Sequence, residues 1–184
     1  MAGKIMLTLA MSIDGYIADE DGAYSWIAGQ GDDRLDTDKE DRFASFMQGI
    51  DTVVMGSRCY REGFARDFGD KEIFVATHAE QKDHDNITFI SGDIVERICR
   101  ERDKGKNIYL FGGGILIDPF IKADVIEEYH IGIVPIILGK GRPLFLGNHP
   151  MLPLHVESYS LKDGIFVILY TKRNESVSEE TVGR

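Results

Sequence analysis

Three consecutive glycines, Gly112 to Gly114, stand between an apolar, strand-like run at residues 108–111 and an apolar segment with helical character. Glycine loses more backbone entropy on folding than any other residue, so a run of glycines between regular elements needs a physical reason. Because glycine has no Cβ atom, a ligand can touch the backbone there, and the first N–H groups of the following helix attract anions. The run therefore predicts a strand, a turn and a helix start that either pack tightly or seat a phosphate or pyrophosphate.

A second junction of this kind follows the short apolar run at residues 52–55. It continues as Gly56, Ser57 and Arg58, and the residues after Gly56 are typical of a helix start. An arginine guanidinium can hold a phosphate through two parallel hydrogen bonds. Two such junctions in one chain favour a nucleotide ligand, although each is also compatible with a structural turn.

Small polar residues follow two further apolar runs. Thr77 and His78 come after the run at 72–76, and Ser91 comes after the run at 87–90. Open α/β sheets hold ligands at the carboxyl ends of their strands, so these residues are candidate ligand contacts as well as ordinary turn residues.

The composition limits the class of protein. With 184 residues and 43% hydrophobic content, we expect one domain over residues 1–172 and a polar tail over 173–184. No apolar run reaches the ~18 residues of a membrane span, and the N-terminus has the pattern of a strand rather than of a signal peptide, so a cytoplasmic location is expected. A formal net charge of -10 argues against nucleic acid and anionic membranes as partners.

No metal site is predicted. Cys59 and Cys99 form no C-x-x-C pair, and His78 and His84 lack a standard metal-ligand spacing. The acidic cluster before Gly22 fails the calcium-loop pattern, because the required ligand positions fall on apolar residues.

Two segments have the spacing of amphipathic helices. The segment 36–48 places Phe43 on an apolar face, and the segment 93–104 begins with Asp93 as the expected N-cap. The polar, glycine-containing stretch after the first strand is expected to be a long loop that ends at about Gly31.

The remaining proline and turn residues predict features of the second half of the fold. Pro119 predicts a kink or a restart of the helix after the glycines, and Pro135 is expected at a sheet edge or a bulge. Lys162-Asp163-Gly164 predicts the turn of an antiparallel hairpin between residues 156–161 and 165–171. Strands alternating with helices and then a hairpin predict an α/β fold with a mixed, largely parallel sheet.

Neither standard nucleotide fingerprint is present. Gly112 to Gly114 lack the spaced third glycine of G-x-G-x-x-G, and no G-x-x-x-x-G-K-[ST] occurs. A Rossmann dehydrogenase and a P-loop kinase are therefore not expected.

Four motifs in a fixed order instead resemble the dihydrofolate-reductase-like family. The closest resemblance is to the branch of the C-terminal reductase domain of the bacterial riboflavin-biosynthesis deaminase-reductase. The motifs are Met11 to Gly15, Gly56 to Tyr60, Phe111 to Gly114, and Pro135 with Leu138 to Phe145, and the resemblance covers about residues 4–172.

The resemblance implies a dihydrofolate-reductase-like three-layer fold and an NADPH-dependent reductase that transfers a hydride to a small pterin-like or pyrimidine-like substrate. It also implies a homodimer, to which the segment from Pro135 to Phe145 contributes. Substrate would occupy the cleft between the loop after Ile17 and the helix at 36–48. The implied cofactor contacts are Ala10, Ile17, Gly56, Ser57, Arg58, Thr77, His78, Ser91, Phe111, Gly112, Gly113, Gly114, Ile115 and Leu116.

A proton must also reach the substrate. Dihydrofolate reductases use a carboxylate on the helix after the mobile loop, so the resemblance makes Asp38 and Asp41 the implied donors here. Our hypothesis is Asp41, because it lies two residues before Phe43. Asp14 is a third candidate, with a rival role as a turn former before Gly15.

A non-catalytic nucleotide-binding homodimer of the same fold is the alternative. The family junction usually reads Gly-Arg-x-Thr-Tyr, whereas here Ser57 follows Gly56 and Cys59 replaces the threonine. This departure, together with the lack of an unambiguous acid, leaves both classes open.

Overall fold

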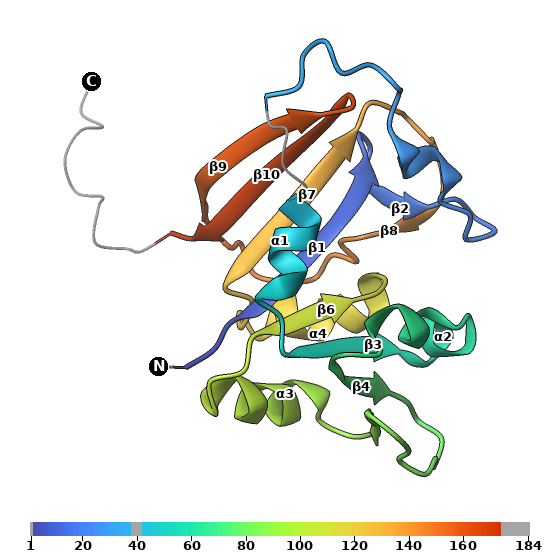
Figure 1. The fold of residues 1–184 in the computed structure, drawn as a ribbon, viewed down its shortest axis with the longest axis vertical. Helices are drawn as coiled ribbons and strands as arrows, with labels where there is room; N and C mark the ends of the chain where they lie inside the picture. The colour runs from blue at the N-terminus through green and yellow to red at the C-terminus, as the bar shows by residue number, and fades with distance from the viewer. Residues whose placement is uncertain (1, 38–41, 174–184) are drawn as a thin grey trace.

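The computed structural model describes residues 2–37 and 42–173, and its centre is an eight-stranded sheet (Figure 1). The strands are β1 (Ile5–Ser12), β3 (Thr52–Gly56), β4 (Glu72–Ala76), β5 (Ile87–Ile90), β6 (Ile108–Phe111), β7 (Glu128–Val134), β9 (Leu154–Lys162) and β10 (Ile165–Lys172). Their spatial order is β5-β4-β3-β6-β1-β7-β10-β9. Neighbours from β5 to β7 are parallel, whereas β10 is antiparallel to β7 and to β9. The predicted mixed, mostly parallel sheet with a C-terminal antiparallel hairpin is confirmed.

Helices cover both faces of this sheet. They are α1 (Arg42–Gln48), α2 (Ser57–Arg61), α3 (Ile94–Asp103) and α4 (Gly114–Lys122), with the 3₁₀ turns η1 (Ser25–Ala28) and η2 (Phe64–Phe68). Ile98 of α3 and Phe120 of α4 pack in one core with Leu7, whereas Phe46 of α1 packs in the other with Met6. Because successive side chains of a strand point to opposite faces, β1 serves both cores. The result is the predicted three-layer arrangement.

Two predictions about helices, the N-cap of α3 and the effect of Pro119 on α4, had different outcomes. The Asp93 carboxylate accepts the N–H of Glu96 at 2.9 Å, which confirms the predicted N-cap of α3. Of the kink or restart predicted at Pro119, the restart is wrong, because α4 runs unbroken through the proline. Proline removes a single helical hydrogen bond, and the fully buried Phe120 holds the next turn on the sheet. Within the described part of the chain, no helix is long and apolar enough to cross a membrane.

The predicted helix at 36–48 is shorter than expected at its start: α1 begins at Arg42, and Asp36 and Thr37 are described outside a helix. Asp38 and Asp41 lie outside the described residues, and so does the tail from residue 174. Phe43 is 51% exposed, and its ring lies against those of Phe46 and Tyr109, so it forms the margin of an apolar face whose centre is Phe46 and Met47.

The segment after β1 has more structure than the predicted long loop. β2 (Tyr16–Ala18) pairs antiparallel with β8 (Arg142–Pro143), and η1 follows. A short strand here depends on a partner more than a hundred residues away, so local patterning did not reveal it.

The two predictions for the end of the chain had different outcomes. Pro135 was expected at an edge or a bulge, but β7 lies between β1 and β10 and ends at Val134, so the proline simply follows an interior strand. The hairpin turn has φ +50° at Asp163 and +77° at Gly164, the positive values of a type I′ turn, which confirms the predicted turn.

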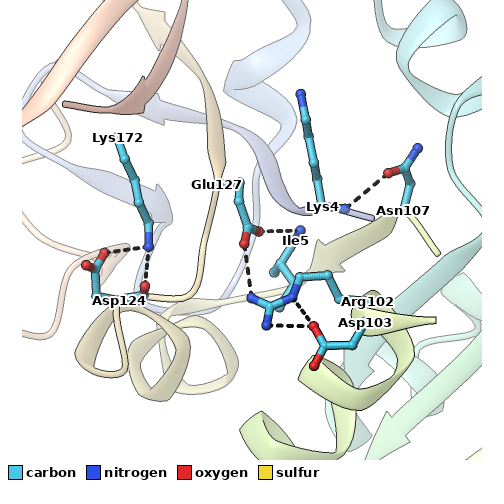
Figure 2. A network of polar contacts seen from close by, with 8 residues as sticks. All are labelled: Lys4, Ile5, Arg102, Asp103, Asn107, Asp124, Glu127 and Lys172. Atoms are coloured by element: carbon cyan, nitrogen blue, oxygen red, sulfur yellow. Dashed lines mark hydrogen bonds and ion pairs between the residues drawn. The ribbon is translucent and has the colours of Figure 1, made fainter. Parts of the chain in front are cut away.

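A network of polar contacts joins the residues at the edge of the sheet where the parallel strands begin (Figure 2). Glu127, just before β7, accepts the amide N–H of Ile5 at 2.6 Å and a guanidinium N–H of Arg102 at 3.0 Å. Arg102 also donates to Asp103, and Asn107 accepts the amide N–H of Lys4 at 3.1 Å. These bonds join the end of α3 to the starts of β1, β6 and β7. The amino edge is therefore held by contacts within the protein, and the candidate site is sought at the opposite edge.

Candidate functional site

The sheet splits at the carboxyl ends of its central strands. β1 pairs with β6 only as far as Leu7, opposite Leu110, whereas it pairs with β7 as far as Ser12. The hydroxyl of Tyr109 donates to the carbonyl of Thr8 at 3.1 Å, at the level where pairing with β6 stops. Ligands of open α/β sheets bind in crevices at the carboxyl ends of strands. The split between β1 and β6 is therefore the centre of the candidate site.

The glycine run lies at this split, and its members have different surroundings. Gly112 has φ +155°. A Cβ atom on Gly114 would lie 2.7 Å from the carbonyl oxygens of both Pro143 and Leu144. A Cβ atom on Gly113 would meet only a methyl group of Ile17, at 3.6 Å. Gly114 is therefore required for packing, whereas Gly113 leaves room for a ligand.

The first turn of α4 presents backbone donors at the same place. The N–H groups of Leu116 and Ile117 donate back to the carbonyl of Gly113, at 3.0 and 3.3 Å. Among the described residues, the N–H groups of Gly114 and Ile115 have no acceptor. Free N–H groups at the start of a helix attract anions. Ile115 is also 87% exposed, so this turn is open to a ligand.

The second glycine junction places a cation beside an open backbone position. Gly56 ends β3, and nothing lies within 4 Å of the position that a Cβ atom would take there. Arg58 is 60% exposed, and its only described ion pair is a loose one with Glu62, at 3.9 Å. Burial raises the pKa of the neighbouring Cys59 thiol, so that side chain stays neutral. Arg58 is therefore a candidate to bind an anion at this junction.

Thr77 and Ser91 line one open pocket of about 460 Å³ between the ends of β4 and β5. The predicted residue His78 is exposed and lies outside the pocket lining. Lys82 is a lining cation that sequence reasoning missed, because it stands in a loop without any recognisable pattern. The other lining residues are Ala79, Glu80, Gln81, Phe89 and Ile90.

Asp14 lies in a turn that joins two loops. Its Oδ1 accepts the hydroxyl of Ser12 at 2.7 Å and the N–H of Leu138 at 3.1 Å, and its Oδ2 accepts the N–H of Gly139 at 2.7 Å. These bonds lower the pKa of Asp14, and the one from Ser12 has the largest effect. Ser12 is fully buried, and its hydroxyl oxygen also accepts the N–H of Tyr16. Hydrogen bonds therefore hold the turn both to Ser12 and to the segment at Leu138 and Gly139.

The other predicted contacts occupy mixed positions. Ala10 lies on β1 opposite Gly132 of β7, within the stretch that has left β6. Phe111 packs against the rings of Phe64 and Phe68, and Leu116 is only 6% exposed. The structure thus brings Ala10 to the split, whereas Phe111 and Leu116 contribute side chains to the packing around it.

The fold defines a class, the α/β proteins with the dihydrofolate-reductase fold. Dihydrofolate reductase from Enterococcus faecalis, in a complex with NADP(H), matches the chain with a TM-score of 0.65, at 13% identity. The match covers 95% of this chain and 99% of that one. At this identity the similarity concerns the fold alone.

Within that class the chain belongs to the family of the RibD C-terminal domain, which matches residues 3–68 and 68–164. The uncharacterized protein YwjB of Bacillus subtilis (strain 168) is 33% identical over 151 residues, which are 79% of this chain and 84% of that protein. The family resemblance expected from the four motifs is confirmed.

Two further solved structures have a similar fold. A candidate riboflavin biosynthesis protein from Shewanella sp. PV-4 is 27% identical, with a TM-score of 0.78 over 95% of this chain and all 100% of that one. The diaminohydroxyphosphoribosylaminopyrimidine deaminase/5-amino-6-(5-phosphoribosylamino)uracil reductase of Thermotoga maritima is 18% identical, with a TM-score of 0.69. The match covers 94% of this chain and 57% of the Thermotoga protein.

Proposed function

We propose that this chain is an NADPH-dependent reductase that transfers a hydride to a small pterin-like or pyrimidine-like substrate. Family membership supports the proposal, since the Thermotoga relative is named as a reductase and the Enterococcus enzyme was solved with NADP(H). The observation that carries it is the split between β1 and β6, with the open Gly113 beside it. The N–H groups of Gly114 and Ile115, which find no acceptor in the described part of the chain, lie at the same place.

The predicted cofactor contacts follow one another across five adjacent strands. Ser91 follows β5, Thr77 follows β4, Gly56 ends β3, Gly113 follows β6, and Ala10 lies near the end of β1. At a strand spacing of about 4.8 Å, this row is about 19 Å long. An extended dinucleotide suits that length, with its adenosine half at the pocket between β4 and β5 and its nicotinamide at the end of β1.

The residues along this row fit an anionic dinucleotide. The N–H groups of Gly114 and Ile115 would hold the pyrophosphate together with Arg58, and Lys82 would offer a cation to a phosphate on the adenosine half. Such local donors are needed because the chain carries a formal net charge of -10. Without them, long-range repulsion would oppose binding of NADPH.

When bound, the reduced nicotinamide supplies the hydride. The contribution of the protein is to orient the two reactants, because transfer requires reacting atoms about 3 to 3.5 Å apart. The backbone at Ala10 and the side chain of Ile17 would border the nicotinamide, and the loop after Ile17 together with α1 would border the substrate.

We retain Asp41 as the proposed proton donor and Asp38 as its alternative. Asp14 is a weaker candidate, because both of its oxygens accept hydrogen bonds and its pKa is lowered. A carboxylate held in that way keeps its negative charge and does not readily deliver a proton.

The test of the proposal is calorimetric titration of the purified protein with NADPH and, separately, with NADH. Tight binding of NADPH is expected, followed by oxidation of NADPH in the presence of a member of a panel of dihydropterins and ribosylated aminopyrimidines. Replacing Asp41 by Asn should then slow turnover and leave cofactor affinity unchanged. Failure to bind either dinucleotide would overturn the proposal.

The alternative is a non-catalytic nucleotide-binding homodimer, and the same titration separates it from the reductase. Binding of NADPH without oxidation by any pterin, aminopyrimidine or flavin of the panel would favour it. The feature that supports this alternative is the altered junction at Gly56, Ser57, Arg58 and Cys59.

We further propose that the protein is a homodimer that buries one face of the β9–β10 hairpin. Val156, Tyr159 and Phe166 are 52%, 63% and 39% exposed, and the strand register places them on the same face. Exposed apolar patches of this kind mark interaction surfaces. Sedimentation analysis should show a dimer that Tyr159→Glu dissociates, and a monomeric wild type would overturn this part of the proposal.

A further inference from the structure

The loop that follows η1 is hydrogen-bonded to the tip of the β9–β10 hairpin. In Figure 1 the described part of this loop, residues 29–37, passes over the hairpin tip. Five hydrogen bonds join residues 30–37 of the loop to residues 161–163 of the hairpin. Because the two segments lie at opposite ends of the sequence, tertiary structure alone creates this contact.

Asp163 is the centre of the contact. Its carbonyl oxygen accepts the N–H of Gln30 at 3.1 Å. Its carboxylate Oδ1 accepts the N–H of Asp32 at 3.0 Å. Its own N–H donates to Oδ1 of Asp36 at 2.6 Å. One turn residue thus makes three bonds to three successive parts of the loop.

Thr37 and Leu161 complete the contact as a reciprocal pair. The N–H of Thr37 donates to the carbonyl of Leu161 at 3.0 Å, and the N–H of Leu161 donates to Oγ1 of Thr37 at 2.9 Å. The fit is close, since a Cβ atom on Gly29 would lie 2.2 Å from a carboxylate oxygen of Asp163. The loop therefore contacts the hairpin from Gly29 to Thr37, shortly before α1.

The start of the same loop is held elsewhere. β2 pairs with β8, and Arg142 donates to the carbonyl of Asp21 at 3.1 Å. Between the two attachments lies η1 with Trp26, the one tryptophan of the chain. The Nε1 atom of Trp26 is buried and has no acceptor among the described residues. A loop attached at both ends holds this indole in place.

We propose that Asp163 is a positioning residue for the substrate side of the site. The inference rests on the proposed reductase function, in which this loop and α1 border the substrate. Asp163 fixes the loop just before α1, so its loss should weaken substrate binding. Cofactor binding should not change, because the cofactor contacts extend from β5 to β1 and the hairpin lies at the other end of the sheet.

Two substitutions at this position separate anchoring from turn formation. Asp163→Gly removes the carboxylate and tolerates the φ of +50°. Asp163→Asn is the matched control, because asparagine also tolerates this conformation and keeps an oxygen that can accept the N–H of Asp32. Asp36→Ala removes the carboxylate that accepts the N–H of Asp163, and so weakens the contact from the loop side. If Asp163→Gly fails to fold, this variant tests whether the contact positions the loop.

The first measurement is amide hydrogen exchange. The N–H groups of Gln30 and Thr37 donate to backbone carbonyls that every variant retains, so faster exchange there reports release of the loop rather than loss of one bond. We expect exchange about tenfold faster in Asp163→Gly, the effect of losing one hydrogen bond, and near wild-type rates in Asp163→Asn. Trp26 fluorescence should shift to longer wavelength in the same variant.

The second measurement separates substrate from cofactor. With dihydrofolate as the pterin probe, its KM should be about tenfold higher in Asp163→Gly than in the wild type. The KM of Asp163→Asn should be close to the wild-type value. The Kd for NADPH should be unchanged in both variants. Unchanged exchange at Gln30 and Thr37 would overturn the proposal, as would an equal loss of NADPH affinity. If the wild type bound no NADPH, the proposed function would fail and the substrate role with it, while altered exchange would still demonstrate the anchor.

Discussion

Oδ2 of Asp14 lies 2.7 Å from the amide nitrogen of Gly139, although 125 residues separate the two in the sequence. The bond joins the turn after β1 to the segment after β7. It therefore holds together the carboxyl ends of β1 and β7, and β1 is the strand that borders the split and carries Ala10.

The first prediction concerns Asp14 itself. Asp14→Ala should lower the Tm, and Asp14→Asn should lower it less, because the amide keeps one acceptor oxygen for the N–H groups. Since the folded pKa lies below the ordinary value of 3.8, this stabilisation is present above that pH and is lost as the pH falls through the folded pKa. Thermal unfolding by circular dichroism measures the effect. A wild-type Tm combined with abolished turnover in Asp14→Asn would instead make Asp14 catalytic.

Neighbouring glycines should respond differently to the same substitution. Gly113 has φ −87°, so Gly113→Ala should fold normally and weaken NADPH binding by placing a methyl group beside the cofactor. Gly114→Ala should destabilise the fold by about 1 to 3 kcal/mol, because the added methyl group meets two backbone carbonyls that cannot move freely. Urea unfolding and calorimetry on both variants make the comparison. Equal effects on stability would contradict the division of roles.

Arg58 is expected to bind the cofactor phosphates. Arg58→Ala should weaken NADPH binding by about 1.5 to 3 kcal/mol, the range for a hydrogen bond to a charged group. Arg100→Ala is the matched control, since Arg100 also pairs with a glutamate in a helix but lies on α3. Titration calorimetry measures both. Unaltered affinity in Arg58→Ala would place this guanidinium outside the cofactor site.

Glu127 should be the most important side chain of the network in Figure 2. Glu127→Ala should lower the free energy of unfolding by about 1.5 to 3 kcal/mol, because it leaves the amide of Ile5 and the guanidinium of Arg102 with one acceptor fewer. Asp103→Ala, which removes a carboxylate that is 60% exposed, should cost about 0.5 kcal/mol or less. Urea unfolding of both variants tests this order, and a larger loss at Asp103 would contradict it.

The last prediction concerns stability in acid. The hydrogen bond with His130, and then the ammonium of Lys4, lower the pKa of Glu128 from 4.5 to about 2. A group with a lowered folded pKa stabilises the protein above its unfolded value. This contribution should be complete above pH 4.5 and should disappear as the pH falls toward 2. Unfolding free energies measured across this range should fall more steeply in the wild type than in Glu128→Gln.

Much of the fold could be predicted because its signals are local. β4 and β5 begin and end where the apolar runs do, Asp93 caps α3, and Asp163 with Gly164 forms the hairpin turn. The sequence also indicated Thr77 and Ser91, which meet at one pocket. Lys82 was not predicted, because no pattern in its own loop distinguishes it. The restart predicted at Pro119 from local chemistry does not occur, because the buried Phe120 packs the next turn on the sheet.

The amino-acid sequence by itself determined where most strands of the central sheet lie, where glycines interrupt them and which residues cap and turn the chain, since these depend on a few neighbouring residues. Tertiary structure alone decided that β1 leaves β6 after Leu7, that Gly114 packs on the carbonyl of Pro143, and that Asp163 holds the loop before α1. Those contacts join segments far apart in the sequence. They form only once the order of strands in the sheet has brought their partners together.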